Sequence, residues 1–194
     1  MIVVVLTGSI AMGKSTTGVM LARRKIPIFD ADRAVHSLLK KGGKAVGLIE
    51  EKFPTAIIES EVDRTILSKI VFEDSLQLSI LESLIHPLVE KERKTFLQRQ
   101  HRQKSKLVVL DIPLYFETKR RYKCDVVCVV SAPRFLQRQR ALDRPGMTKE
   151  RLNAILSRQL LDHEKRKRAD FVVLTGLGRA YTNRILSKLL NQIR

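Results

Sequence analysis

Residues 1–16 read MIVVVLTGSIAMGKST, so that an apolar run leads directly into the pattern G-x-x-x-x-G-K-[ST]. In loops of this kind, main-chain N–H groups close around anionic phosphate oxygens, and side chains at Gly8 and Gly13 would block that approach. The helical, apolar pattern after residue 16 disfavours the alternative, a strand-to-helix turn that binds nothing. The opening residues therefore predict a buried strand, a phosphate-binding loop and a helix that together hold a nucleoside triphosphate.

Two side chains of the loop suit the chemistry of a nucleotide site. Lys14 can reach the β- and γ-phosphates, and the Ser15 hydroxyl can bind Mg²⁺. We expect the nucleotide to contact Gly8, Ala11, Met12, Gly13, Lys14, Ser15 and Thr16.

The length and composition are those of one globular domain, residues 1–194. A chain of 194 residues buries enough surface to fold without disulfides or a structural metal. No window approaches the ~18 apolar residues of a membrane span, and no secretory leader is found, so we expect a cytoplasmic protein that does not enter membranes. Cys124 and Cys128 are expected to face the same side of one strand as small buried residues. The sequence leaves the oligomeric state open.

The chain is strongly basic, with 37 Lys and Arg against 20 Asp and Glu and a formal net charge of +17. Such a charge is common in nucleic-acid-binding proteins. Aromatic residues make up only 5% and Trp is absent, so no platform for base stacking is expected. The basic residues are spread over several runs, including 91–106 and 119–123. This distribution favours solvated helix faces and the attraction of a polyanionic small substrate over nucleic-acid binding.

Five short apolar runs are separated by segments with helical periodicity. They are Ile2–Leu6, Ile26–Phe29, Leu107–Leu110, Val126–Val130 and Phe171–Leu174. Near-continuous Val, Ile and Leu without alternation are typical of parallel strands covered by helices on both faces. The pattern predicts an α/β fold in three layers around a five-stranded parallel sheet.

Two further segments stand out from this repeating pattern. A long gap between the second and third runs is mostly helical and predicts a helical insertion over about 42–100, kinked or broken at Pro87. Between the fourth and fifth runs, Pro133 opens a helix to about Leu142, and Thr148 caps a second helix that extends to Leu160. We expect this helical hairpin to act as a lid over about 137–165.

The lid carries Arg138, Arg140 and Arg144 around its turn. Arginines on a mobile hairpin beside a phosphate site can neutralise charge on a transferring phosphoryl group and exclude water. The alternative is a basic hairpin that is merely solvated.

Acidic residues follow two of the predicted strands at the end where ligands bind in open parallel sheets. Asp32, after the second strand, is the candidate base for an attacking hydroxyl, or else an N-cap of the following helix. Asp111, after the third strand, could hold Mg²⁺ directly or through water, or else be a turn residue before Pro113.

Five motifs occur in the order found in one family of kinases. They are the loop 6–16, Phe29–Asp32 with its D-A-D element, Leu84–Leu88 with H-P-L, Asp111–Glu117, which is similar to D-x-P-L-L-F-E, and Arg140–Arg144 with Gln159 and residues 169–173. Through these motifs the chain resembles the dephospho-CoA kinase family over nearly its whole length, and the family fold is that of the P-loop kinases.

The resemblance implies transfer of the ATP γ-phosphoryl group to the ribose 3′-hydroxyl of dephospho-CoA, with Mg²⁺ as the metal. It implies that Asp32 is the base, that Lys14 and Arg140 act in catalysis, and that Arg144 contacts ATP. Dephospho-CoA would be bound by Asp32, His86, Pro113 and Leu114, with its pantetheine arm in the insertion. A nucleoside monophosphate kinase is the nearest alternative, and an NTP-dependent nucleic-acid-binding protein is a less favoured one.

The chain departs from the family pattern at two places. Glycines are usual where Ser9 and Ala11 stand, and serine where Met12 stands, so this loop is bulkier. Phosphate binding is expected to persist because Gly8, Gly13 and Lys14 remain. The usual Asn-x-Gly turn after the last strand is replaced by Leu174–Gly178, which leaves the adenine contacts open.

Overall fold

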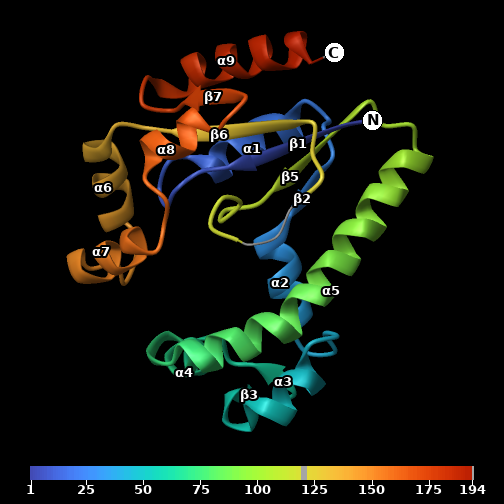
Figure 1. Cartoon of the computed structure of the whole chain (residues 1–194), viewed down its shortest axis with the longest axis vertical. Helices are drawn as coiled ribbons and strands as arrows, with labels where there is room; N and C mark the ends of the chain where they lie inside the picture. Colours follow the sequence, from blue (N-terminus) through green and yellow to red (C-terminus); the bar gives the residue numbers. More distant parts are fainter. Residues whose placement is uncertain (119–121, 194) are drawn as a thin grey trace. The chain divides into compact units, whose positions relative to one another are not determined.

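The computed structural model describes residues 1–118 and 122–193, without the side chains at 72 and 73 (Figure 1). It divides into two compact units. One consists of Met1–Phe29 with Gln100–Arg194 and contains the main sheet, and the other is Asp30–Arg99. We call them the sheet unit and the helical unit.

The main sheet has five strands, β1 (Ile2–Thr7), β2 (Ile28–Asp30), β5 (Leu107–Asp111), β6 (Val126–Ser131) and β7 (Phe171–Leu174), in the order β2-β5-β1-β6-β7. Strand β1 lies at the centre and pairs in parallel with β5 and β6, and β6 pairs in parallel with β7. The predicted five-stranded parallel sheet in an α/β fold is confirmed.

The ends of the strands differ slightly from the predicted runs. Strand β2 begins at Ile28 because Pro27 has no N–H to donate to the sheet and Ile26 is bound to the end of helix α1 (Lys14–Arg23). The Ile26 N–H donates to Leu21 O at the end of helix α1, and Pro27 O accepts from Val109 N at 2.9 Å. Strands β5 and β6 each include one polar residue beyond the apolar run, Asp111 and Ser131.

Helices α1 (Lys14–Arg23) and α9 (Gly178–Gln192) pack on the sheet through one apolar cluster. In this cluster Leu21 and Leu186 lie against Leu6 and Val130, all at most 2% exposed. Helix α8 (Asp162–Lys167) packs against β6. The central strands are buried without alternation because helices cover the sheet.

The sequence analysis expected Cys124 and Cys128 to face the same side of one strand, but of the two only Cys128 lies in a strand. Cys128 is buried in β6, and burial raises the pKa of its thiol to about 12. Cys124 lies before the strand, half-buried, with its Sγ 3.4 Å from the Tyr115 hydroxyl. Strand β6 begins after Cys124 because Val3 N of β1 donates at 2.7 Å to the side-chain carboxylate of Asp125 and not to a main-chain oxygen.

The helical unit contains α2 (Ala31–Leu39), α3 (Val46–Lys52), a 3-10 turn (Pro54–Ala56), strands β3 (Ile57–Ile58) and β4 (Glu61–Val62), α4 (Arg64–Glu73) and most of α5 (Ser75–Arg102). Leu38, Ile49, Phe53, Leu67 and Ile85 form the centre of its own apolar core. A second core explains why this segment forms a compact unit.

Two local features of the helical unit differ from expectation. Helix α5 continues through Pro87 without a break. The β3–β4 hairpin was not predicted, since its turn residues Glu59 and Ser60 adopt φ values of 49° and 66° without the Gly or Asn that usually marks such turns.

The basic segment that ends α5 is not wholly solvated. The Arg93 side chain is buried and donates to both carboxylate oxygens of Glu90. Of the other basic run, 119–123, residues 119–121 lie outside the described residues. Among the helices that are described, none combines the length and apolar character needed to cross a membrane.

The predicted hairpin is formed by α6 (Arg134–Leu142) and α7 (Lys149–Ser157) in the sheet unit. Thr148 caps α7 as expected, its hydroxyl accepting from Arg151 N at 3.2 Å. Helix α7 ends at Ser157, so Leu160 lies outside the helix to which the sequence analysis assigned it.

Replacing Gly8 tests the close approach of the loop to the sheet. A methyl group on Gly8 would lie 2.6 Å from Val130 O, so strand or loop would have to move. We expect Gly8→Ala to lower the free energy of unfolding by about 1–3 kcal/mol, measured by urea denaturation. Gly47→Ala is the matched control, because no atom lies within 4 Å of the added methyl and alanine favours the helix. Equal stability of the two variants would contradict the contact.

Candidate active site

The phosphate loop links the end of β1 to the start of α1. Its two fixed glycines are required for different reasons. Gly8 lies against the Val130 carbonyl, as described above, whereas Gly13 has a φ of 95°, a conformation open to glycine at little cost. A methyl on Gly13 would also lie 2.9 Å from Thr175 Oγ1.

Helix α1 begins at Lys14 and has no side chain capping its first turn. Within the described part of the chain, the main-chain N–H groups of Lys14, Ser15 and Thr16 donate to no protein acceptor. The first N–H groups of a helix carry partial positive charge and together attract anions. The loop therefore presents several donors at one place, as a phosphate site requires.

Lys14 and Asp111 are brought together at the centre of this site. Lys14 Nζ lies 2.5 Å from Asp111 Oδ1, and both side chains are largely buried. Asp111 is the last residue of β5, opposite Leu6 in the register with β1, and so is not the turn residue of the alternative interpretation. Helix α1 passes close to this pair at Gly18, where an added methyl would make an ordinary contact of 3.7 Å with Asp111 Oδ2.

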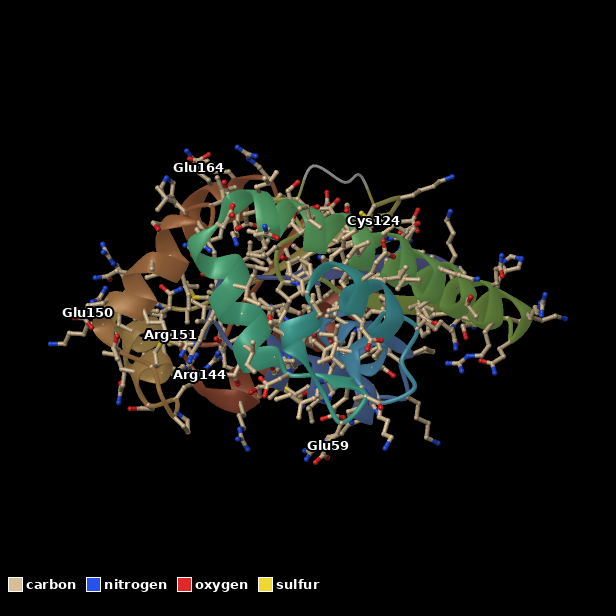
Figure 2. The ribbon with its side chains drawn as sticks, turned by 90° about the horizontal axis from the view of Figure 1, so that it is seen from below. Glu59, Cys124, Arg144, Glu150, Arg151 and Glu164 are labelled. Atoms are coloured by element: carbon tan, nitrogen blue, oxygen red, sulfur yellow. The ribbon has the colours of Figure 1, made fainter. Side chains whose placement is uncertain are left out.

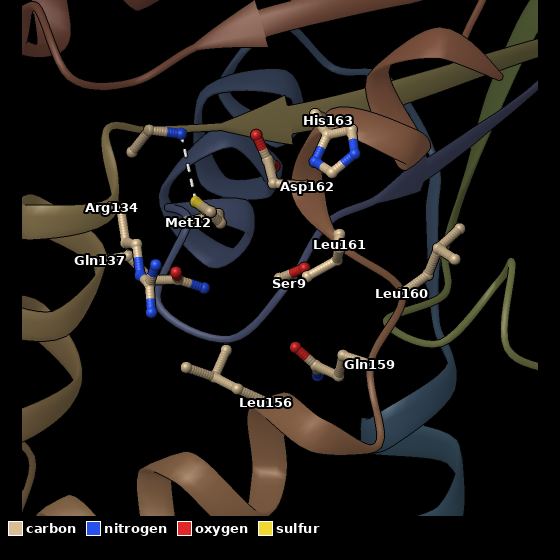
Figure 3. Close-up of a pocket in the computed structure, with 11 residues that line it drawn as sticks. Ser9, Met12, Arg134, Gln137, Leu156, Gln159, Leu160, Leu161, Asp162 and His163 are labelled. Carbon is tan, nitrogen blue, oxygen red and sulfur yellow. Dashed lines mark hydrogen bonds between the residues drawn. The ribbon is translucent and has the colours of Figure 1, made fainter.

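The bulky loop residues are accommodated by burial. Met12 is 2% exposed, and its Sδ accepts from Ala132 N at 3.1 Å, the bond drawn as a dashed line in Figure 3. Ser9 is also buried. Ala11 has a φ of 59°, a left-handed conformation that costs an alanine about 1–2 kcal/mol and that glycine adopts freely.

Thr175 connects the loop to Arg140, one of the three predicted lid arginines. Its hydroxyl donates to Met12 O at 2.7 Å. Arg140 donates from its guanidinium to the Thr175 hydroxyl and carbonyl oxygens at 3.1 and 3.0 Å. Sequence reasoning missed Thr175, although the altered turn at 174–178 was the signal that could have drawn attention to it.

The remaining arginines of the hairpin differ in their surroundings. Arg138 donates to Asn153 at 3.3 Å and so links α6 to α7. Arg144 is exposed in the turn between the helices, where Figure 2 shows it together with Arg151. The hairpin thus carries positive charge in the same unit as the phosphate loop.

The predicted substrate residues are divided between the two units. Pro113 and Leu114 follow β5 in the sheet unit, where Pro113 O accepts from the Thr7 hydroxyl at 3.0 Å and Leu114 is exposed. Asp32 and His86 belong to the helical unit, Asp32 exposed in the first turn of α2 and His86 half-buried on α5.

Asp30, rather than Asp32, caps helix α2. The Asp30 carboxylate accepts from Arg33 N at 2.9 Å, whereas Asp32 is the second residue of the helix. The alternative interpretation, in which Asp32 is the N-cap, is therefore wrong, because the N-cap lies two residues earlier at Asp30. An acid in the first turn is favoured by the helix dipole.

A buried ion pair supports the segment that follows α7, and sequence reasoning missed it. Lys165 on α8 has no exposed surface, and its Nζ lies 2.7 Å from Glu117 Oε1, the acid that ends the D-I-P-L-Y-F-E motif. The same oxygen accepts from Leu160 N at 2.9 Å. Glu117 therefore joins the segment after β5 to the segment after α7.

A cavity of about 460 Å³ lies beside the phosphate loop (Figure 3). It is lined by Ser9, Met12, Ala132, Arg134, Gln137, Leu156, Gln159, Leu160, Leu161, Asp162 and His163. These residues come from the loop, from α6 and the residue Ala132 before it, and from α7, α8 and the chain between them. Beside this space, the hairpin packs on the loop through the buried cluster of Ala11, Ala141 and Leu152.

Ser15 and Asp111 are the residues that the sequence analysis expected to hold a metal. Among the described residues, no three His, Cys, Asp or Glu side chains gather into a metal site. A hydroxyl and a carboxylate are suitable ligands for Mg²⁺ when phosphate oxygens and water complete its coordination. The residues at the loop thus fit a metal that arrives with the nucleotide.

The Glu117–Lys165 pair generates a prediction about stability. Lys165→Met leaves a buried carboxylate without its cation, so we expect the free energy of unfolding to fall by about 3–5 kcal/mol. In the double variant Glu117→Gln, Lys165→Met, the amide oxygen still accepts from Leu160 N and no charge is left unpaired. Urea denaturation should show that the double variant recovers most of the loss, and a double variant as unstable as the single one would contradict the pairing.

Comparison with known proteins agrees with the geometry of the loop. A family model for dephospho-CoA kinase matches residues 2–177. A dephospho-CoA kinase of Mesorhizobium japonicum is 47% identical over 196 aligned residues, covering 99% of this chain and 98% of the relative. One from Paramagnetospirillum magneticum is 52% identical over 161 residues, covering 83% of this chain and 76% of the relative.

Solved structures agree in fold. The crystal structure of a Thermus thermophilus protein aligns with a TM-score of 0.81 at 30% identity, covering 100% of this chain and 98% of the other. A dephospho-CoA kinase from Campylobacter jejuni aligns with a TM-score of 0.68 at 25% identity, covering 98% of this chain and 96% of the other. With its phosphate loop, its Lys14–Asp111 pair and these relatives, the chain belongs to the dephospho-CoA kinase family.

Proposed function

We propose that this protein transfers the γ-phosphoryl group of ATP to the 3′-hydroxyl of the ribose of dephospho-CoA, giving coenzyme A and ADP. The observation that carries the proposal is the phosphate loop with Lys14 against Asp111, in a chain that belongs to this family. Because both substrates are water-soluble polyphosphates, we also place the reaction in the cytoplasm, and the net charge of +17 suits their attraction.

The loop holds the triphosphate through its main chain. The main-chain N–H groups of Lys14, Ser15 and Thr16 donate to phosphate oxygens, and Lys14 Nζ exchanges its contact with Asp111 for the β- and γ-phosphates. The Ser15 hydroxyl and the Asp111 carboxylate would hold Mg²⁺, Asp111 directly or through water. When bound, the metal neutralises charge on the phosphate oxygens.

Asp32 accepts the proton of the attacking hydroxyl. As this proton leaves, the 3′-oxygen forms a bond to the γ-phosphorus, and the bond between that phosphorus and the bridging oxygen of ADP breaks. The position of Asp32 in the first turn of α2 supports this role, because Asp30 caps the helix in its place.

Positive charge and substrate contacts come from the remaining site residues. Arg140 and Arg144 neutralise charge that develops on the transferring group, and Arg144 also contacts ATP. His86, Pro113 and Leu114 contact dephospho-CoA, with its pantetheine arm in the insertion at about 42–100.

The direct test of the proposed function mixes purified protein with ATP, Mg²⁺ and dephospho-CoA and measures CoA formation by chromatography. We expect stoichiometric formation of CoA and ADP. AMP, offered in a parallel reaction, should not be phosphorylated. Phosphorylation of AMP without CoA formation would instead indicate a nucleoside monophosphate kinase.

Asp32→Asn tests the base. The amide cannot accept the proton, so we expect kcat to fall by ~10²-fold or more while the dissociation constant for ATP is nearly unchanged. The matched control is Asp30→Asn, two residues away, because asparagine caps helices as well as aspartate does. We expect that control to retain kcat, and full turnover by Asp32→Asn at saturating substrates would refute the assignment.

A further inference from the structure

Both main-chain polar groups of Ile10, at the tip of the phosphate loop, are bound by glutamine side chains. Gln159 accepts through Oε1 from Ile10 N at 3.0 Å, and Gln137 donates through Nε2 to Ile10 O at 3.0 Å. Gln137 lies on α6 and is 5% exposed, and Gln159 follows the end of α7. Figure 3 shows both side chains at the cavity beside the loop.

The directions of these two hydrogen bonds follow from the chemistry of the main chain. An N–H group requires an acceptor, so Gln159 must present its amide oxygen. A carbonyl requires a donor, so Gln137 must present its NH₂ group. Gln159 therefore acts as the acceptor and Gln137 as the donor, and both bind the main chain of Ile10.

Because of these two bonds, the main-chain N–H and carbonyl of Ile10 are engaged with the glutamines and not with other groups of the loop. The Ile10 N–H and carbonyl are bound to residues of the hairpin segment, while the N–H groups of Lys14, Ser15 and Thr16 donate to no acceptor in the described part of the chain. Next to Ile10, Ala11 packs with Ala141 of α6 and Leu152 of α7 in one buried cluster. The strained alanine thus gains an apolar contact with both helices that glycine could not make.

The same helix holds the loop at a second point. Gln137 and Arg140 are three residues apart on α6, and residues at this spacing lie on one helix face. Arg140 binds Thr175, whose hydroxyl donates to Met12 O. Movement of α6 therefore acts on the loop at both Ile10 and Met12.

We propose that Gln137 and Gln159 are positioning residues that couple the shape of the phosphate loop to the hairpin bearing Arg140 and Arg144. This inference rests on the proposed function, since it is the triphosphate of ATP that the loop shape serves. The hairpin cannot be displaced without pulling on the Ile10 peptide groups. Neither glutamine needs to touch the nucleotide to affect its binding.

A charge-matched pair of variants tests the coupling. Gln159→Glu keeps an acceptor for Ile10 N, whereas Gln137→Glu places a carboxylate against Ile10 O and loses the donor. Both add the same charge beside the same residue. By titration calorimetry with ATP and Mg²⁺, we expect the dissociation constant to rise by less than about 3-fold in Gln159→Glu and by roughly 10-fold or more in Gln137→Glu.

A neutral pair, Gln137→Met and Gln159→Met, keeps the test decisive if the buried glutamate prevents folding. Each removes one bond without adding charge, so we expect ATP binding to weaken by roughly 3- to 10-fold in both. Hydrogen exchange of the peptide containing Ile10 should accelerate in Gln159→Met and stay slow in Gln159→Glu, a rescue that general destabilisation would not produce.

Three results would overturn the proposal. They are equal weakening of ATP binding in the two glutamate variants, wild-type binding in both methionine variants, and unprotected Ile10 exchange in Gln159→Glu. None of these measurements uses dephospho-CoA. Failure of the proposed function would appear separately, as absence of CoA formation by the wild-type protein.

Discussion

An anion-binding loop must leave some of its main-chain N–H groups without protein acceptors, here, among the residues that the structure describes, those of Lys14, Ser15 and Thr16, and this requirement shapes the sheet unit. Each buried donor left unsatisfied costs about 1–3 kcal/mol, so the loop cannot be stable through its own hydrogen bonds. It is held from outside, at Ile10 by two glutamines and at Met12 by Thr175 and by Ala132 N. The surrounding elements therefore fix the shape of the loop, which its own hydrogen bonds would not fix alone.

The segment from Asp111 to Glu117 carries an acid at each end, and each acid faces a lysine from another element. Asp111 faces Lys14 of the loop, and Glu117 faces Lys165 of α8. The first pair lies where phosphate is expected and can be exchanged for ligand contacts. The second is enclosed by protein and joined to Leu160, so it fixes the chain that leads out of α7. The segment from Asp111 to Glu117 therefore forms one ion pair that a bound nucleotide can replace and one that stays in place.

Much of the fold could be predicted because its signals are local. Continuous Val and Ile runs identify the buried strands, and G-x-x-x-x-G-K-S identifies the loop and the helix after it. The β3–β4 hairpin has no such signal, since Glu59 and Ser60 are unusual at positive φ. The end of α7 before Leu160 depends on Glu117, which is distant in sequence.

Of the residues at the site, too, some could be predicted from the sequence and others could not. Lys14 and Asp111 were expected at one location because loop and strand end must meet in a parallel sheet, and the structure brings them together. Gln137, Thr175 and Lys165 were missed, since a glutamine, a threonine or a lysine shows no sign in the sequence of which distant group it will bind. The catalytic role of Asp32 stays a prediction.

The buried thiol of Cys128 has a consequence for an enzyme whose substrate and product both end in a sulfhydryl group. With its pKa raised to about 12, Cys128 is almost wholly protonated at neutral pH, and the protonated form does not attack disulfides. Oxidised coenzyme A accumulating near the protein would therefore find no reactive partner at this position. Strand β6 would therefore escape S-thiolation under oxidative stress.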